Sequence, residues 1–471
     1  MQIIDWIHAW AKTAPDRTAY TGEGRSLSYG ALWTDAVRLS AALRQFPESR
    51  FLLRGGKAPE MVVGMLGCLL AGKTYVPISP ELPPARLERI LELTAPCKLL
   101  TADSSRIPDS ILISALLEPL PAAEEPAVPE NQPAYVIFTS GSTGTPKGVP
   151  ISRRNLDHFA KWICSLESMR LPAPARVMNT AAFSFDLSVA DLCYSLCSGH
   201  SLYAPAKDRV ADPAGILDFM GTNRIEAVIC TPTFLKLCLL EPGFRAAQLS
   251  DLQVVYSCGE PLEKKTAGKL LERFPALRLI NAYGPTEATS AVCAVQVTRE
   301  LLAKHDSLPV GKIDTAACRL SIDRGEIVLT GESVFSGYFD GNTQGWYLEN
   351  GQATFRTGDL GSIEGNYLYC KGRRDRQIKW KGYRIELDEI EQTILSVPGV
   401  ENCAVIAKKT DAGTVRLIKA FVVLQSGTVD LLRSNLIRLL PDYMIPKSIT
   451  ELQEIPTTEN GKTDRKRLES L

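Results

Sequence analysis

A hydroxyl- and glycine-rich segment at residues 139–148 has the residue types of a phosphate-binding loop. Its glycines can bring backbone N–H groups close to an anion, its hydroxyls add donors, and its lysine adds a positive charge. The spacing differs from that of the common P-loop, Gly-x-x-x-x-Gly-Lys-Ser/Thr. A flexible surface turn is the alternative interpretation of this segment. The candidate phosphate ligands are Thr139, Ser140, Gly141, Ser142, Thr143, Gly144 and Lys147.

Three further polar motifs carry groups that nucleotide chemistry could use. Tyr283-Gly-Pro-Thr-Glu287 combines an aromatic ring, a hydroxyl and a carboxylate. Thr357-Gly-Asp359 offers a carboxylate that can accept hydrogen bonds from two vicinal hydroxyls. Asn460-Gly-Lys462 offers a lysine that would ordinarily be a surface residue. We expect all of these motifs to lie in loops, where each could also be an ordinary turn or a solvated pair.

The elements that position these motifs follow from the hydrophobic pattern. Short apolar runs alternate with helix-length periodic stretches, which predicts an α/β fold with β-α-β units and a largely parallel sheet. Residues 257–260 and 281–287 follow two such runs, so we expect them at the carboxyl edge of the sheet, beside the 139–148 loop. The proline-rich stretch 118–133 reads as a linker or surface excursion. Ser152 can cap a helix whose apolar residues lie on one face. Short strands punctuated by glycine follow from about residue 310, and the last ninety or so residues read as a separate α+β domain.

Composition excludes several classes of protein. Lys plus Arg and Asp plus Glu number 53 each in 471 residues, which gives no support for nucleic-acid or membrane-surface binding. The twelve cysteines contain no Cys-x-x-Cys pair and the four histidines are scattered, so a Cys/His metal site is not expected. Apolar settings of several cysteines favour a reducing cytoplasm. The longest uncharged run, residues 61–72, is too short to span a bilayer, and the N-terminus reads as an amphipathic helix.

Taken together, the four polar motifs resemble those of the adenylate-forming enzymes, and they stand in that family's order along essentially the whole chain. The resemblance implies a large N-terminal adenylation domain of mixed and parallel sheets flanked by helices, residues 1–374. It implies a small, mobile α+β C-terminal lid, residues 375–471, that turns about a hinge near Asp375. The implied reaction joins a carboxylate to ATP as an acyl adenylate, with Mg²⁺ as cofactor and loss of pyrophosphate.

The resemblance also implies roles for single residues. Lys462 matches the lid lysine that reaches the carboxylate and α-phosphate, Thr286 matches the phosphate-contacting hydroxyl, and Glu287 matches the Mg²⁺-binding carboxylate; these three are the expected catalytic residues. Tyr283 would offer its ring face to adenine. The implied ATP site consists of the seven loop residues above with Gly259, Glu260, Asn281, Ala282, Tyr283, Gly284, Thr286, Asp359, Arg373 and Lys462, of which Asp359 and Arg373 would lie near the ribose.

Phe185-Asp-Leu-Ser188 narrows the expected substrate. In members of the family that activate amino acids, an aspartate at the Asp186 position pairs with the α-ammonium, although here it could simply cap the following helix. Within the family the chain is most similar to stand-alone enzymes that load D-alanine onto a carrier protein. Cys258 matches a cysteine that narrows their pocket to a small side chain, and a structural cysteine is the alternative. Asp186, Leu187, Cys258, Ser290 and Ala291 form the expected substrate-binding set.

The resemblance implies that the aminoacyl group passes to the phosphopantetheine thiol of an acyl or peptidyl carrier protein. A basic run at 371–384, with seven cations to one acid, could face an acidic carrier. Nucleic acid and membrane insertion are not expected, and we expect a cytoplasmic monomer. Three alternatives stay open: adenylation of glycine, serine, proline or L-alanine for non-ribosomal peptide or other natural-product synthesis, an acyl-coenzyme A synthetase, and a nucleotide-binding protein without turnover.

Overall fold

The computed structural model describes residues 1–471 except 104–106, 119–128, 142–144, 411–412 and 459–462. The chain divides into two compact units. The larger unit comprises Met1–Pro80, Thr94–Ile137 and Val149–Lys371, and the smaller unit comprises Glu81–Leu93, Phe138–Gly148 and Gly372–Leu471. The predicted boundary at 374/375 and the hinge at Asp375 stay predictions, because one arrangement does not reveal the residue about which parts turn. Most of the proline-rich stretch, residues 119–128, lies outside the described residues.

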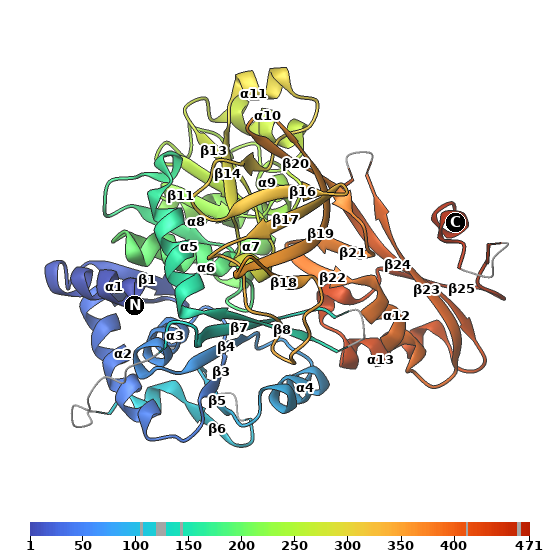
Figure 1. Ribbon diagram of the computed structural model, residues 1–471, viewed down its shortest axis with the longest axis horizontal. Helices are drawn as coiled ribbons and strands as arrows, with labels where there is room; N and C mark the ends of the chain where they lie inside the picture. The colour runs from blue at the N-terminus through green and yellow to red at the C-terminus, as the bar shows by residue number, and fades with distance from the viewer. Residues whose placement is uncertain (104–106, 119–128, 142–144, 411–412, 459–462) are drawn as a thin grey trace. The chain divides into compact units, whose positions relative to one another are not determined.

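An eight-stranded sheet forms one layer of the larger unit (Figure 1). Its six inner strands, from β13 to β1 in sheet order, run parallel, and an antiparallel strand closes each edge. The predicted β-α alternation is thereby confirmed. In sheet order the strands are β14 (Cys293–Val297), β13 (Arg278–Tyr283), β12 (Val254–Ser257), β11 (Ala227–Cys230), β9 (Arg176–Asn179), β10 (Ser201–Ala204), β1 (Thr18–Gly22) and β2 (Arg25–Ser28).

A second sheet, of six strands, carries the 139–148 segment between its last two strands. Parallel pairing joins its first five strands, and most of these are apolar and buried, as is typical of parallel strands covered on both faces. In sheet order these are β6 (Ser110–Leu112), β5 (Lys98–Thr101), β3 (Arg50–Arg54), β4 (Thr74–Ile78), β7 (Pro133–Thr139) and β8 (Lys147–Ser152).

Helices connect these strands, and they differ in burial: the helix Pro59–Ala71 is buried on all sides, whereas Lys207–Ala211 has no buried residue. In α5 the Ser152 hydroxyl accepts from the Asn155 N–H at 3.1 Å and the Asn155 amide oxygen accepts from the Ser152 N–H at 3.0 Å, a reciprocal cap that confirms Ser152 as the helix start. The helices are α1 (Gln2–Thr13), α2 (Tyr29–Arg44), α3 (Pro59–Ala71), α4 (Pro84–Thr94), α5 (Arg153–Ser165), α6 (Leu187–Cys197), α7 (Lys207–Ala211), α8 (Pro213–Thr222), α9 (Pro232–Cys238), α10 (Lys264–Arg273) and α11 (Arg299–Lys304).

A third, antiparallel sheet corrects one expectation. Thr357-Gly-Asp359, which we expected in a loop between short strands, lies inside one strand of thirteen residues. The β17–β19 register shifts at this point and Gly358 has φ +74°, so the motif sits on a β-bulge. The strands are β15 (Gly311–Lys312), β20 (Tyr367–Arg373), β19 (Gln352–Glu364), β17 (Glu326–Thr330) and β16 (Arg319–Asp323), with β18 (Trp346–Glu349) paired to β19.

The smaller unit has the predicted α+β composition. A two-stranded hairpin precedes a three-stranded sheet, and helices pack on that sheet around an apolar core that includes Ile390, Val405 and Leu436. No helix among the described residues has the length and apolar character needed to cross a membrane. The elements are β21 (Gln377–Trp380), β22 (Tyr383–Glu386), α12 (Leu387–Leu395), β23 (Val400–Lys409), β24 (Val415–Leu424), α13 (Val429–Leu439), β25 (Ser448–Glu451) and α14 (Arg465–Glu469).

Candidate functional site

Four parallel strands of the larger unit end at the same edge of the eight-stranded sheet. Cys230 pairs in register with Ser257, and Ser257 pairs with Asn281, so the segments that follow β11, β12 and β13 lie side by side. Asn179 ends β9 beside Ile229 of β11. The sheet therefore brings together the predicted 257–260 and 281–287 segments and the connection from β9 to α6.

Asp186 and Thr286 meet at this edge. The Thr286 hydroxyl donates to the Asp186 carboxylate at 2.6 Å. Within the described chain the Asp186 side chain makes no capping hydrogen bond to α6, although the residue stands at the N-cap position. The helix-cap interpretation of Asp186 is therefore wrong. The Asp186 carboxylate, predicted to bind the substrate, lies beside the Thr286 hydroxyl, predicted to contact phosphate.

Tyr283 and Asp359 also form a pair. The buried Tyr283 hydroxyl donates to the Asp359 carboxylate at 2.7 Å, and both side chains are almost completely buried. Burial, and to a lesser extent the neighbouring carboxylate, raises the pKa of Tyr283 well above its ordinary value, so the phenol stays a donor. The Gly358 N–H in the bulge beside Asp359 donates to the Glu326 carboxylate at 2.9 Å.

Glu287 lies on a single 3₁₀ turn, η3 (Thr286–Ala288), and is completely buried. Its carboxylate accepts a hydrogen bond from the Tyr338 hydroxyl at 2.7 Å. A buried carboxylate with a fixed orientation has the hard oxygen ligand that Mg²⁺ prefers. The described residues contain no group of three or more His, Cys, Asp or Glu side chains that could hold a metal ion.

The turn after Glu287 has an unusual backbone. Thr289 has φ +58° and Ser290 has φ +73°, two consecutive residues with side chains in the left-handed region. For a β-branched residue this conformation is strained, and such strain concentrates at functional sites. Gly284 permits the turn, because a Cβ there would lie 2.4 Å from the Cα of Ala291. The predicted residues Ser290 and Ala291 are thus packed directly against the Tyr283–Glu287 motif.

The remaining predicted residues at this edge are held by backbone and side-chain contacts. Cys258 is buried, and its N–H donates to the Cys230 carbonyl at 3.1 Å. Glu260 accepts from the Thr233 N–H at 3.0 Å and from its hydroxyl at 2.6 Å, so this carboxylate supports the start of α9. Asn281 donates to the Pro309 carbonyl at 2.8 Å. Gly259 has φ +94°, and Ala282 and Leu187 are buried.

In the smaller unit the start of the 139–148 segment is bound by residues that the sequence did not single out. The Ser140 hydroxyl donates to the Arg384 carbonyl at 2.8 Å and accepts from the Glu386 N–H at 3.0 Å. The Gly141 N–H donates to the Glu389 carboxylate at 3.0 Å, and Glu389 also pairs with Arg86. No sequence signal marks Glu389 or Arg86, because their pairing spans about three hundred residues.

Within the same unit the Thr139 hydroxyl donates to the Lys147 carbonyl at 3.4 Å, and both residues are buried. Gly141 allows a tight fold here, since a Cβ would lie 2.0 Å from the Thr145 carbonyl oxygen. The predicted contacts of Ser142, Thr143, Gly144 and Lys462 lie outside the described residues.

Arg373 and Asp375, predicted for the ribose and the hinge, bind each other. The guanidinium donates to both carboxylate oxygens, at 2.7 and 2.6 Å. Burial by itself would raise the pKa of Asp375. The hydrogen bonds and the charge of Arg373 outweigh burial and hold this pKa below its ordinary value. Arg376 likewise pairs with Asp388 and Glu391. The seven-to-one ratio of the basic run therefore overstates its charge, because Asp388 and Glu391, which follow the run closely in sequence, neutralise part of it.

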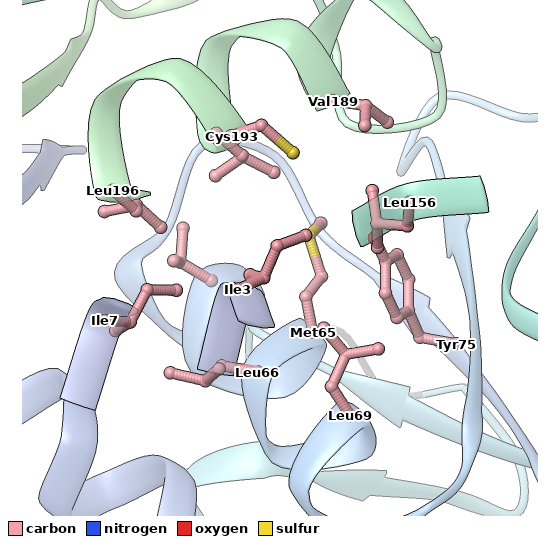
Figure 2. Close-up of a pocket in the computed structure, with 12 residues that line it drawn as sticks. Ile3, Ile7, Met65, Leu66, Leu69, Tyr75, Leu156, Val189, Cys193 and Leu196 are labelled. Atoms are coloured by element: carbon pink, nitrogen blue, oxygen red, sulfur yellow. The ribbon is translucent and has the colours of Figure 1, made fainter. Parts of the chain in front are cut away.

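An apolar cavity of about 50 Å³ lies elsewhere in the larger unit. Figure 2 shows Ile3 and Ile7 of α1, Met65 of α3 and Val189 of α6 around it. Twelve residues line this cavity, none of them a predicted site residue, and its volume is below that of a small ligand. We interpret the cavity as a packing gap between helices.

Comparison with known proteins identifies the family of the chain. The family described as AMP-binding enzyme matches residues 7–339, and the AMP-binding enzyme C-terminal domain matches residues 389–462. The chain is 36% identical to the D-alanine--D-alanyl carrier protein ligase of Bacillus licheniformis, over 99% of each chain. It is 34% identical to the protein of that name from Bacillus cereus strain B4264, again over 99% of each chain.

Two solved structures share the fold. The adenylation domain AlmE of Vibrio cholerae, in complex with glycyl-adenosine-5'-phosphate, superposes with a TM-score of 0.84 at 23% identity, covering 100% of this chain and 96% of that chain. An NRPS protein containing adenylation and PCP domains, bound to a vinylsulfonamide inhibitor, superposes with a TM-score of 0.82 at 25% identity, covering 99% of this chain and 83% of that chain. The predicted fold class is confirmed, and the chain belongs to the AMP-binding enzyme family.

Proposed function

We propose that the protein activates a small α-amino acid with ATP and passes the aminoacyl group to the phosphopantetheine thiol of a carrier protein. In the first step a carboxylate oxygen of the amino acid attacks the α-phosphorus of ATP, and the bond to the β-phosphate breaks to release pyrophosphate. In the second step the thiolate sulfur attacks the acyl carbon and AMP leaves. The relatives named as D-alanine--D-alanyl carrier protein ligases make D-alanine the first candidate substrate.

The 2.6 Å hydrogen bond between Thr286 and Asp186 carries this proposal. In an α-amino acid, one carbon separates the ammonium from the reacting carboxylate. The group that binds the ammonium must therefore lie beside the groups that hold the α-phosphate, and Asp186 beside Thr286 meets that requirement. A fatty or aryl acid has no ammonium and would not use Asp186, which disfavours the acyl-coenzyme A synthetase alternative.

Other residues of the chain take supporting roles in this proposal. Tyr283 would stack its ring on adenine while its hydroxyl orients Asp359 toward the ribose. Glu287 would hold Mg²⁺, which neutralises phosphate charge when bound, and its orientation would be fixed by Tyr338. Thr139, Ser140, Gly141 and Lys147 would contact the β- and γ-phosphates, and Lys462 would supply the cation that stabilises charge developing at the α-phosphate.

We further infer that the protein works as a monomer in the reducing cytoplasm. All twelve cysteines lie among the described residues, none of them forms a disulfide there, and most are buried. Burial raises the pKa of the Cys68 and Cys238 thiols, so these groups stay neutral and unreactive. Light scattering at several protein concentrations would test the monomeric state.

Exchange of labelled pyrophosphate into ATP tests the proposed reaction. The assay should be run with D-alanine, L-alanine, glycine, serine, proline and simple carboxylic acids in parallel. D-alanine should give the highest kcat/KM, and the same amino acid should then be loaded onto a phosphopantetheinylated carrier protein. Exchange that depends only on a fatty or aryl acid would contradict the proposal, as would ATP binding without exchange for any acid.

A further inference from the structure

Lys57 lies between β3 and α3, and its ammonium reaches a buried polar site of the larger unit. The residue is half-buried, but its Nζ donates to the amide oxygen of the fully buried Asn179 and to the Ala181 carbonyl. The same nitrogen lies 4.9 Å from the centre of the Phe183 ring. All three contacts fall on the end of β9 and on the connection that leads to Asp186.

Asp191 on α6 completes the cluster. The Asn179 amide donates to one oxygen of the completely buried Asp191 carboxylate, and the other oxygen has no hydrogen-bond partner among the described residues. Burial raises the pKa of Asp191 well above its ordinary value, although the charge of Lys57 and the hydrogen bond from Asn179 act to lower it. Burial lowers the pKa of Lys57 to about 8, although the charge of Asp191 acts to raise it. Both shifts disfavour the charged forms, so this cluster opposes folding.

The backbone of Lys57 is fixed from the opposite side. The Tyr20 hydroxyl donates to the Lys57 carbonyl at 2.8 Å, and the Lys57 N–H donates to the Glu23 carboxylate at 2.8 Å. Gly22 allows this approach, because a Cβ there would lie 2.1 Å from the Lys57 carbonyl oxygen. Lys57 is thus held by the β1–β2 hairpin while its side chain holds residues 179–183.

Residues 180–186 are therefore fixed at both ends, by Lys57 at Ala181 and by Thr286 at Asp186. We propose that Lys57 is a positioning residue for amino-acid recognition, which holds the 180–186 connection so that the Asp186 carboxylate meets the substrate ammonium. This inference rests on the proposed function, in which Asp186 binds that ammonium. It explains why the protein retains a cluster that opposes folding, since residues that serve activity often reduce stability.

A double variant separates this role from a merely structural one. Lys57→Met with Asp191→Asn removes both ionisable groups and keeps similar side-chain volumes. We expect an amino-acid KM in pyrophosphate exchange about tenfold to a hundredfold higher, as a small displacement of a binding group produces. The ATP KM should stay within about twofold, and the melting temperature should be unchanged or higher because no buried charge is left unpaired.

Lys73→Met is the matched control. The Lys73 ammonium also donates to two backbone carbonyls of the larger unit, those of Phe46 at 3.0 Å and Glu48 at 2.8 Å, but it does not contact the 180–186 connection. This control should lower the melting temperature and leave both KM values unchanged. Should the double variant fail to fold, Lys57→Gln keeps one donor for the Ala181 carbonyl with a shorter reach, and should still raise the amino-acid KM severalfold.

Each outcome decides one question. An amino-acid KM equal to that of the wild type in a folded Lys57 variant, or equal increases in the KM values of amino acid and ATP, would overturn the positioning role alone. A wild-type protein that shows no exchange with any amino acid would overturn the proposed function and, with it, the role of Lys57. A selective rise in the amino-acid KM, absent in Lys73→Met, supports both.

Discussion

The Gly141 backbone N–H donates to the Glu389 carboxylate at 3.0 Å, so an amide of the predicted phosphate loop already has an anionic partner within the smaller unit. The same carboxylate pairs with Arg86, and both side chains are buried. A phosphate oxygen that binds the Gly141 amide must therefore replace a carboxylate oxygen. We expect ATP to compete with this carboxylate for the Gly141 amide.

Glu389→Gln should strengthen ATP binding. The amide keeps the size of the side chain but removes the negative charge, so the Gly141 N–H and Arg86 become better partners for phosphate. We expect the ATP KM in pyrophosphate exchange to fall about threefold to tenfold, and the melting temperature to fall because Arg86 loses its charged partner. Glu391→Gln, on the same helix but paired with Arg376 and Arg465, is the control and should change stability only. An unchanged or higher ATP KM in Glu389→Gln would contradict the competition.

Asp186→Asn should weaken the binding of the amino acid and leave the binding of ATP nearly unchanged. Loss of the charge that binds the ammonium should raise the amino-acid KM by about tenfold to a hundredfold, since a charge-assisted hydrogen bond contributes ~1.5–3 kcal/mol. ATP binding, measured by calorimetry, should stay within about twofold, the remaining change coming from the weaker, uncharged acceptor that the amide oxygen offers to Thr286. Asp157→Asn is the matched variant, because Asp157 accepts from the Gln2 and Ile3 N–H groups and should affect only stability. Equal amino-acid KM values in the two variants would refute the role of Asp186.

Tyr283→Phe keeps the ring and removes the hydrogen bond to Asp359. We expect the ATP KM to rise about tenfold to a hundredfold, because a hydrogen bond to a charged group contributes roughly 1.5–3 kcal/mol, with little change in the amino-acid KM. Tyr194→Phe removes another buried hydroxyl, which donates to the Met169 carbonyl at 2.5 Å, and should only reduce stability. A similar ATP KM in both variants would show that the Tyr283 hydroxyl is structural.

Cys258→Gly should broaden the amino-acid specificity. Removal of the thiol opens space in the predicted pocket wall, and each methylene-sized group changes discrimination by about tenfold. The ratio of kcat/KM for L- or D-valine to that for D-alanine should rise accordingly in a substrate panel. Cys238→Gly empties an equally buried position in another apolar cluster and should leave the ratio unchanged. A constant ratio in Cys258→Gly would place this cysteine outside the pocket.

Val189→Ile should fill part of the cavity shown in Figure 2 and raise stability. One additional methyl group in a preformed gap should increase the free energy of unfolding by about 1 kcal/mol. Val228→Ile is the contrast, because Val228 is buried in the packed sheet core and overpacking there should destabilise. Urea midpoints would measure both changes, and equal shifts of the two variants would argue against an accessible gap.

The sequence by itself determined the α/β pattern, the helix start at Ser152 and the chemical types of the site residues. Periodicity and capping depend on residues a few positions apart, so they can be read from a linear string. The same holds for Tyr283–Glu287, whose ring, hydroxyl and carboxylate are adjacent in sequence. The parallel strand order placed the 257–260 and 281–287 segments at one edge, as the strand ends predicted.

Only the tertiary structure decided which of these groups bind one another. Asp186 contacts Thr286 across 100 positions, Tyr283 contacts Asp359 across 76, and Gly141 contacts Glu389 across 248. The bulge that moves Asp359 out of its expected loop depends on the register between β17 and β19. Lys57 illustrates the reason most plainly: its ammonium is directed to Asn179 and Ala181 by a hairpin and a sheet edge that meet only after folding, and no local pattern encodes that meeting.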